Sequence, residues 1–590
     1  MGTIKKITKG MKKRYWLFTI LTPITMIGEV FFETVIPYLM ALIIDKGIAD
    51  QNIKYVLTTG AFMIGCSLVS LSCGIGGARF AALASQGFSH NLRSILFNKV
   101  QSFSFSNVDK FSTASLVTRL TTDVTNVQNV FQMLIRICFR APFMLIAGCL
   151  MAIKINASLS VVFLISIPVL AFFISFISLK AYPRFSEMLS KYDVMNRIVQ
   201  ENLIAIRVVK AFVRGDYENQ KFEQAADDVK KTQVCAERLI LWLLPVMQIV
   251  IYSTLIAVFW LGGRKVVFGS MLAGELISFL TYVMQILTSL MMIGMIFVSV
   301  VLSRASIRRI SEVLDETPDI TEKTASCVQT VRDGSIVFNN VNFSYSNNVE
   351  NCVLNDINLS IKNGQTVGII GGTGSGKSTL ISLVPRLYDC FDGSVKVGGV
   401  DVRDYSLKAL RDSIAVVLQK NVLFKGTIRD NLLWGNKDAS DSEIKAACDA
   451  SDASSFIESF ADGYDTELGQ GGVNISGGQK QRLCIARALL KKPKILILDD
   501  STSAVDMSTE ARIRTNLKQM FPETTKIIIA QRISSVQDAD MIIVMNDGKI
   551  DGIGNHAELL KSNEIYQEVY NSQKDYSDAD LVETKIGAGE

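Results

Sequence analysis

The sequence predicts an α-helical membrane domain followed by a soluble α/β domain, and three observations lead to this division. The chain has 590 residues, more than one domain normally holds. Its long apolar runs lie within 15–300, and 49% of the whole chain is hydrophobic. Residues 330–570 instead alternate strand-like and helix-like stretches, which is typical of a parallel sheet covered by helices. We expect a membrane domain at 1–302, a linker at 303–334, an α/β domain at 335–572 and a tail at 573–590 that is disordered after Gln573.

Six apolar segments in the first half are each long enough to cross a hydrocarbon core of about 30 Å. They cover roughly 16–44, 56–84, 135–153, 159–179, 239–268 and 276–302. A basic stretch at 5–14 precedes the first segment and predicts a multi-pass protein of the plasma membrane with a cytoplasmic N-terminus. The long connections at about 87–134 and 180–238 are then cytoplasmic. We expect them to be helical extensions of the spans, because structureless loops of that length are uncommon.

Several charged residues fall inside the predicted spans. Glu29 and Glu33 are four residues apart on one helix face, and Arg79, Arg136 and Arg140 lie in the second and third segments. Charged groups in a membrane are costly and face a cavity or a partner. The carboxylates either line a pathway for cationic substrate groups, or they pair with an arginine or lie near the outer interface. The sequence leaves both interpretations open.

The net charge and the cysteines argue against a nucleic-acid-binding protein and against a disulfide-stabilised one. A net charge of +5 gives no reason to expect a nucleic-acid partner. The ten cysteines are scattered and form no C-x-x-C pair, which favours free thiols over a disulfide framework.

A glycine-rich turn in the second half carries the strongest functional signal. It has the pattern G-x-x-x-x-G-K-S, follows an apolar strand at 366–370 and leads into a helix. Backbone N–H groups of such a turn close around phosphates, and the pattern predicts nucleotide binding. Lys377 should reach the β- and γ-phosphates, and the Ser378 hydroxyl should bind Mg²⁺. The nucleotide-binding residues are predicted to be Gly371, Thr373, Gly374, Ser375, Gly376, Lys377, Ser378 and Thr379.

Other polar residues follow apolar strands and belong at the same edge of the sheet, where ligands of α/β folds bind. Asp499 closes the strand at 495–498 and is predicted to complete the Mg²⁺ shell with Ser378. Gln419 is a candidate contact for Mg²⁺ and the attacking water. Tyr345 is predicted to stack on adenine, with a core tyrosine as the alternative.

A second stretch of small residues before a helix predicts another phosphate-binding terminus. It consists of Ile475, Ser476, Gly477, Gly478 and Gln479. Two such sites on one chain would lie far apart unless two copies face each other.

In combination, these motifs resemble a half-transporter of the ATP-binding cassette (ABC) exporter superfamily, over essentially the whole chain to about residue 572. The turn resembles the Walker A loop, 495–499 Walker B, 475–479 the signature and 503–506, which ends at Asp506, the D-loop. Two further stretches, 107–119 and 201–216, resemble those that hold the coupling helices. The resemblance implies a head-to-tail pair of chains in the bilayer, with ATP and Mg²⁺ between one chain's Walker A and the other chain's signature.

Two positions of the catalytic site depart from the family pattern, and in the otherwise intact signature Ile475 replaces the family's leucine. Asp500 stands where hydrolysing members have glutamate, and Gln531 stands where they have histidine. Aspartate is one methylene shorter than glutamate, and glutamine cannot become cationic at neutral pH. The chain therefore resembles the degenerate-site subunit of a heterodimeric multidrug exporter, which hydrolyses ATP mainly as an assembled pair with a second half-transporter and moves small amphipathic molecules. Alternatives are a homodimer in which the replacements are harmless, an exporter of lipid or peptide, and an ATP-gated regulator or channel.

Overall fold

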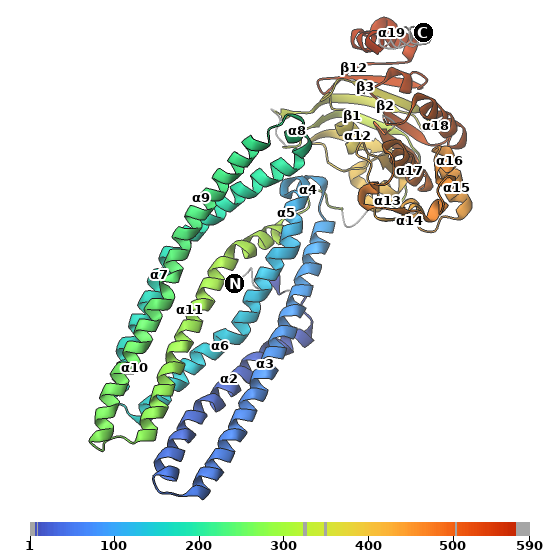
Figure 1. The fold of residues 1–590 in the computed structure, drawn as a ribbon. Helices are drawn as coiled ribbons and strands as arrows, with labels where there is room; N and C mark the ends of the chain where they lie inside the picture. The colour runs from blue at the N-terminus through green and yellow to red at the C-terminus, as the bar shows by residue number, and fades with distance from the viewer. Residues whose placement is uncertain (1–5, 9, 323–326, 347–350, 502–503, 574–590) are drawn as a thin grey trace. The chain divides into compact units, whose positions relative to one another are not determined.

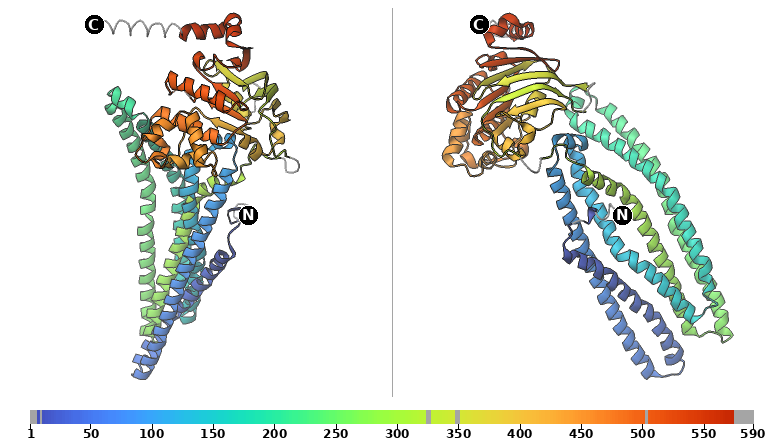
Figure 2. Two further views of the ribbon diagram at one scale, coloured as in Figure 1. Left: turned by 90° about the vertical axis from the view of Figure 1, so that its right-hand side faces the viewer. Right: turned by 180° about the vertical axis from the view of Figure 1, so that it is seen from behind.

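The computed structural model describes residues 6–8, 10–322, 327–346, 351–501 and 504–573. The chain forms two compact units (Figures 1 and 2). The first contains Met1–Ser102 and Phe111–Glu316, and the second contains Phe103–Lys110 and Thr317–Glu590.

The first unit is built from long helices that run side by side (Figure 1). In the described residues, six helical stretches are long and apolar enough to cross a membrane, which confirms the predicted class. The long helices are α2 (Lys13–Leu42), α3 (Ile53–Gln101), α6 (Val124–Ile155), α7 (Val161–Ile204), α10 (Leu243–Val267) and α11 (Ala273–Asp315). Shorter pieces connect them: η1 (Ile43–Ile48), α5 (Thr113–Thr118), η2 (Arg119–Asp123), α8 (Ile206–Ala211) and α9 (Gly215–Leu241).

Several helices extend well beyond the length that a bilayer needs. Helix α3 has 49 residues, and at 1.5 Å per residue it is about 74 Å long, more than twice a hydrocarbon core. The long connections after α3 and α7 are helical over most of their length, as predicted. Helix α11 also continues to Asp315, so the first part of the stretch expected to be a linker is helical.

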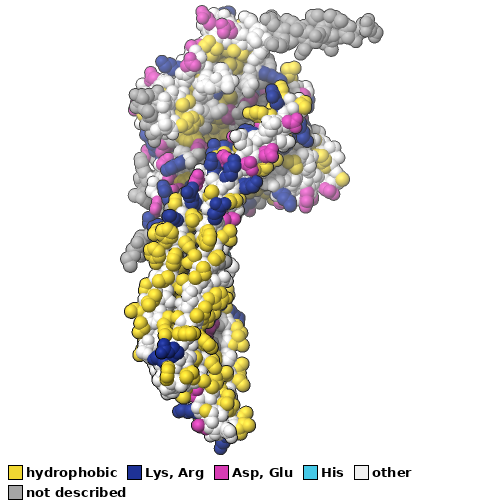
Figure 3. Space-filling model, turned by 60° about the vertical axis from the view of Figure 1, so that its left-hand side comes forward, with side chains coloured by type: hydrophobic (Ala, Val, Ile, Leu, Met, Phe, Trp, Pro, Cys, Tyr) yellow, Lys and Arg dark blue, Asp and Glu magenta, His cyan; other side chains and the backbone are white. Residues whose placement is uncertain are grey.

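The surface of these helices is largely apolar (Figure 3). Side chains such as those of Leu164 and Ile165 are 76% and 66% exposed. Soluble proteins rarely expose so large an apolar area to water, so the helices are suited to a lipid environment.

The described residues of the second unit form three sheets. One is antiparallel in the order β2-β1-β4-β5, with β1 (Ile336–Phe343), β2 (Leu354–Ile361), β4 (Asp392–Val397) and β5 (Val400–Asp401). The prediction of two separate strands at 335–338 and 342–345 is wrong: they form the single strand β1, whose pairing is irregular after Phe338. A short ribbon pairs β7 (Gly426–Thr427) with β8 (Glu467–Leu468).

The central sheet has the order β12-β11-β3-β10-β9-β6. Its strands are β3 (Thr366–Gly371), β6 (Ile414–Val417), β9 (Ile495–Asp499), β10 (Thr525–Ile529), β11 (Met541–Asn546) and β12 (Lys549–Gly554). All neighbours are parallel except β11 and β12. Strand β9 is buried throughout, because Leu496 and Leu498 pack in one hydrophobic core and Ile495 and Ile497 in another. The parallel register brings the carboxyl ends of β3, β9 and β10 to one edge.

Helices cover both faces of this sheet. They are α12 (Lys377–Leu383), α13 (Leu407–Ser413), α14 (Ile428–Leu433), α15 (Asp441–Ala450), α16 (Ser454–Glu458), α17 (Gly477–Leu490), α18 (Met507–Met520) and α19 (His556–Ser562). Residues 564–573 are also helical. The short helix α4 (Phe105–Phe111), from the first half of the sequence, packs with this unit: Tyr388 donates to the Asp109 carboxylate at 3.0 Å.

Candidate nucleotide-binding site

The glycine-rich loop joins β3 to α12 and encloses a lysine ammonium group. Gly374 and Gly376 have φ angles of +85° and +93°, which glycine adopts without the strain of a Cβ. This path lets the Lys377 ammonium donate to the carbonyl oxygens of Gly371 at 2.8 Å and Gly372 at 2.6 Å. Burial lowers the pKa of Lys377, and the Asp499 and Asp500 carboxylates oppose that shift. The loop thus holds a cation where a polyphosphate would need one.

The two predicted Mg²⁺ ligands lie together. The Ser378 hydroxyl donates to Oδ1 of Asp499 at 3.1 Å, and Asp499 is only 7% exposed. Burial raises the pKa of this carboxyl, while the bond from Ser378 opposes the rise. A hydroxyl beside a carboxylate is a pair of hard oxygen donors, so these residues fit Mg²⁺.

Asp500 is held by two glutamine amides. Its Oδ2 accepts from Nε2 of Gln531 at 2.8 Å and from Nε2 of Gln419 at 3.4 Å. Strand β9 lies between β6 and β10, so the residues that follow these strands converge on Asp500 from both sides. Burial raises the pKa of Asp500, and the two amide bonds partly offset the rise.

Tyr345 lies just beyond β1 and is not a core residue, because it is 54% exposed. Its hydroxyl lies 3.0 Å from the Thr379 hydroxyl at the start of α12. The rings of Phe343 and Tyr388 contact it edge-on, at centroid distances of 4.9 and 5.2 Å. The ring is therefore fixed beside the phosphate loop, and much of its surface is open.

The signature residues form the N-terminus of α17. Ser476 caps the helix: its hydroxyl accepts from the Gln479 backbone, and the Gln479 side chain accepts from the Ser476 backbone at 2.9 Å. Ser476 and Gly477 are exposed, whereas the side chain of Ile475 packs against the core. A Cβ on Gly478 would come within 2.9 Å of the Ala504 carbonyl, which explains the need for glycine. The terminus is therefore rigid and accessible.

The last predicted site residue, Asp506, caps α18. Its carboxylate accepts from the Thr509 backbone at 3.0 Å and from the Ser508 hydroxyl at 2.6 Å. These bonds lower the pKa of Asp506. Ser503, at the start of the predicted D-loop, lies outside the described residues.

Comparison with known proteins identifies the family. Residues 19–290 match the family described as ABC transporter transmembrane region, and residues 354–503 match the family described as ABC transporter. The uncharacterized ABC transporter ATP-binding protein YfiB of Bacillus subtilis is 37% identical over 95% of this chain and 97% of its own length. The chain belongs to the ABC transporters. It combines one transmembrane region with one ATP-binding domain, as a half-transporter does, and such proteins bind and hydrolyse ATP as dimers in a lipid bilayer.

Two other known proteins are similar to nearly the whole chain. The ATP-dependent lipid A-core flippase of Desulfotalea psychrophila is 30% identical over 95% of this chain and 93% of its own length. The solved structure of a bacterial Atm1-family ABC exporter with ATP bound has the same fold, with a TM-score of 0.80, 22% identity and coverage of 96% of this chain and 99% of that one.

The two glutamates in the first membrane helix of the transporter pair with an arginine, which was one of the two interpretations of the sequence. Arg140 of α6 lies 3.3 Å from Glu29 and 3.0 Å from Glu33 of α2, so the carboxylates share one arginine. Arg136 is half-buried in the same helix. Arg79 is exposed and lines a hollow of about 460 Å³ between α2 and α3.

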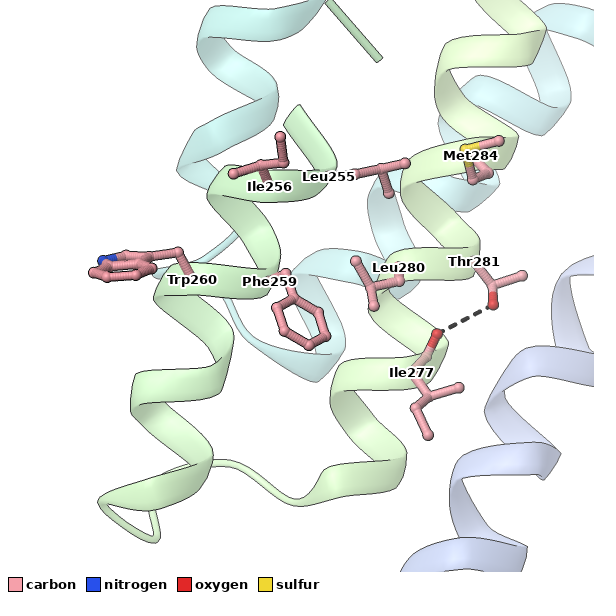
Figure 4. A pocket seen from close by; sticks show the side chains of 8 residues that line it. All are labelled: Leu255, Ile256, Phe259, Trp260, Ile277, Leu280, Thr281 and Met284. Carbon is pink, nitrogen blue, oxygen red and sulfur yellow. Dashed lines mark hydrogen bonds between the residues drawn. The ribbon is translucent and has the colours of Figure 1, made fainter. Parts of the chain in front are cut away.

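An apolar groove of about 670 Å³ runs between α10 and α11 of the transporter (Figure 4). The only hydroxyl among its lining side chains is that of Thr281, and it donates to the Ile277 carbonyl at 3.1 Å. The groove is lined by Leu255, Ile256, Phe259, Trp260, Ile277, Leu280, Thr281 and Met284.

Sequence reasoning missed one residue that contacts the nucleotide-binding site. The side chain of Gln573 bonds to the backbone of Gln531 and of Ile533, about forty residues earlier in the chain. A single glutamine in a polar stretch carries no motif, so no signal in the sequence points to it.

Proposed function

We propose that this chain is one subunit of a heterodimeric ATP-driven exporter. Its own Walker A site binds ATP and hydrolyses it slowly, and its signature completes a faster site on a second half-transporter. The observation that carries this proposal is the combination of an intact signature with a cluster of Asp500, Gln531 and Gln419 in place of a glutamate and a histidine.

The geometry of Asp500 supports slow hydrolysis at this chain's own site. A general base must come within hydrogen-bonding distance of the attacking water. The short Asp500 side chain accepts two amide bonds at a single oxygen, Oδ2. Gln531 donates one of these bonds, and its amide neither releases nor takes up a proton at neutral pH. The cluster is therefore suited to holding ATP and poorly suited to activating water.

The signature supports a role on the partner's nucleotide. Helix α17 has 14 residues, and its N-terminus presents the exposed Ser476 and Gly477 on a rigid capping box. Such a terminus offers N–H groups and partial positive charge to a phosphate. The isoleucine at position 475 leaves these phosphate-binding groups unchanged, because its side chain packs against the protein core.

The substrate class is proposed from the groove between α10 and α11. Its lining is apolar and open, with Phe259 and Trp260 64% and 71% exposed, and its volume of about 670 Å³ would accommodate the apolar part of a drug-sized molecule. We therefore infer a small amphipathic cargo. Lipid transport is a second candidate, favoured by the relative named as a lipid A-core flippase.

We further infer that the N-terminus and the ATP-binding domain are cytoplasmic. Lys12, Lys13 and Arg14 stand at the start of the first membrane helix, and positive charge is retained on the cytoplasmic side.

Affinity purification of the tagged full-length chain from its native membrane tests the heterodimer. We expect a second half-transporter with glutamate and histidine at the positions equivalent to 500 and 531. In the purified pair, Asp500→Asn should leave ATP turnover near normal, whereas replacing the partner's glutamate by glutamine should abolish it. The reverse result, or recovery of this chain alone with brisk turnover, contradicts the proposal.

A further inference from the structure

The end of the C-terminal helix is bonded to the segment that carries Gln531. Nε2 of Gln573 donates to the Gln531 carbonyl oxygen at 2.8 Å, and Oε1 of Gln573 accepts from the Ile533 N–H at 2.9 Å. One amide thus binds the backbone on both sides of Arg532. This is how a neighbouring strand would satisfy these groups, and here a single side chain does so.

The helix that presents Gln573 is firmly anchored. Tyr566 is fully buried and belongs to the same hydrophobic core as Ile533 and Val536. Its hydroxyl lies 2.7 Å from Nδ1 of His556, and its backbone N–H donates to the Asn563 side chain at 2.8 Å. Because these contacts fix the helix on the domain, the position of Gln573 is set by the fold and not by the segment at 531–533 that it binds.

The bonds of Gln573 lead directly to the nucleotide site. The backbone that it holds belongs to Gln531, whose side-chain amide donates to Asp500 at 2.8 Å. Asp500 follows Asp499, which the Ser378 hydroxyl contacts. Gln531 is therefore linked through Asp500 to the pair of residues predicted to bind Mg²⁺.

We propose that Gln573 is a positioning residue for this site: it holds the segment at 531–533 so that the Gln531 amide faces the terminal phosphate of ATP. This inference rests on the proposed assignment of Gly371–Ser378 and Asp499 as the ATP and Mg²⁺ site. A segment ordered before binding loses less conformational entropy when the nucleotide arrives. The benefit is specific to ATP, because ADP lacks the γ-phosphate that Gln531 would contact.

Equilibrium titration of the full-length chain in lipid nanodiscs with fluorescent ATP and ADP analogues and Mg²⁺ tests the proposal. Gln573→Ala should raise the Kd for ATP about three- to tenfold, the range expected from one or two net hydrogen bonds, and leave the Kd for ADP within about twofold. Gln573→Glu, which places a carboxylate oxygen against the Gln531 carbonyl, should raise the Kd for ATP at least as much as Gln573→Ala.

Gln567 provides a matched control on the same helix. Its side chain donates to the Leu560 carbonyl at 2.9 Å, within the C-terminal segment. Gln567→Ala should change neither Kd. In a Gln531→Ala background, Gln573→Ala should have no further effect on ATP binding, because the residue acts through Gln531.

The outcomes separate this inference from the proposed function. An unchanged ratio of ATP to ADP affinity in Gln573→Ala, or an equal loss of both affinities, overturns the positioning role while the ATP site stands. Wild-type protein that binds no ATP overturns the proposed site and the inference with it. A selective loss of ATP affinity that Gln531→Ala abolishes supports both.

Discussion

Replacing Asp500 by glutamate and Gln531 by histidine should together convert the nucleotide site, which we propose to be slow, into a fast one. The first change adds one methylene and moves the carboxylate about 1.5 Å further into the site, one C–C bond length. The second removes the amide that donates to Asp500 at 2.8 Å and supplies a side chain that can become cationic.

The expected gain follows from what the cluster lacks. Aspartate and glutamate have nearly the same acidity, so the deficit at Asp500 is one of reach. A positioned general base contributes typically 10²- to 10⁴-fold to a reaction. Because the loop lysine, the Mg²⁺ ligands and the signature are already present, we expect the double variant to gain about 100-fold, the lower end of that range.

The assay is phosphate release by the full-length chain, self-paired at high density in lipid nanodiscs. Under the proposal, such a pair contains two intact signatures and two degenerate sites, so each single variant should gain much less than the double variant. Adding Lys377→Ala to the double variant should remove the activity, since that lysine binds the loop carbonyls where the phosphates would lie. Wild-type turnover of about 1 per second or faster, with no gain in the double variant, would refute the reasoning, since that rate is already ordinary for an enzyme.

Three further predictions follow from other contacts. Burial raises the pKa of Asp499. Ionisation of this carboxyl therefore lowers the free energy of unfolding, and the loss is complete once the pH exceeds the raised pKa. Asp499→Asn should therefore raise the apparent melting temperature at pH 7, by a margin that shrinks as the pH falls, while weakening Mg²⁺-dependent ATP binding. Tyr345→Ala should raise the Kd for ATP roughly 5- to 100-fold, the range for loss of one stacked base, whereas Tyr345→Phe, which loses only the contact with Thr379, should change it less than about threefold. Asp123→Ala removes a buried carboxylate that binds Arg309 at 2.7 Å, and it should lower thermal stability by about 1–2 kcal/mol, because that arginine remains half-exposed; a loss below about 0.5 kcal/mol would contradict the role of this pair.

Much of the fold could be predicted because the membrane and the phosphate loop both impose strong sequence patterns. Long apolar runs identify the spans even where single charges such as Glu29 and Arg140 fall inside them. The ends of helices were less predictable: α11 continues to Asp315 through residues such as Arg308 and Glu312, whose polarity resembles that of a linker. These two side chains lie 3.3 Å apart in an i,i+4 pair, and such pairs support a helix that hydropathy alone does not detect.

The site divides in the same way. The sequence predicts that Ser378 and Asp499 lie together, because parallel strands bring their carboxyl ends to one edge, and in the structure the Ser378 hydroxyl lies 3.1 Å from the Asp499 carboxylate. The contact between Gln531 and Asp500 was not predicted, although each had been noted as a departure from the family pattern. The contact forms because β10 and β9 are neighbours in the sheet, and the order of strands in a sheet cannot be predicted from local sequence.

That contact changes how the two departures should be understood. At 2.8 Å, the Gln531 amide and the Asp500 carboxylate form one hydrogen-bonded unit, so the two replacements are coupled and not two independent losses. An amide always donates to the carboxylate, whereas a histidine at 531 would do so only in a suitable tautomer or charge state. Residues in direct contact give non-additive effects on mutation. The free-energy gain of the double variant should therefore exceed the sum of the two single gains. Strict additivity would mean that the pair does not act as a unit, and that the short reach of Asp500 alone makes the site slow.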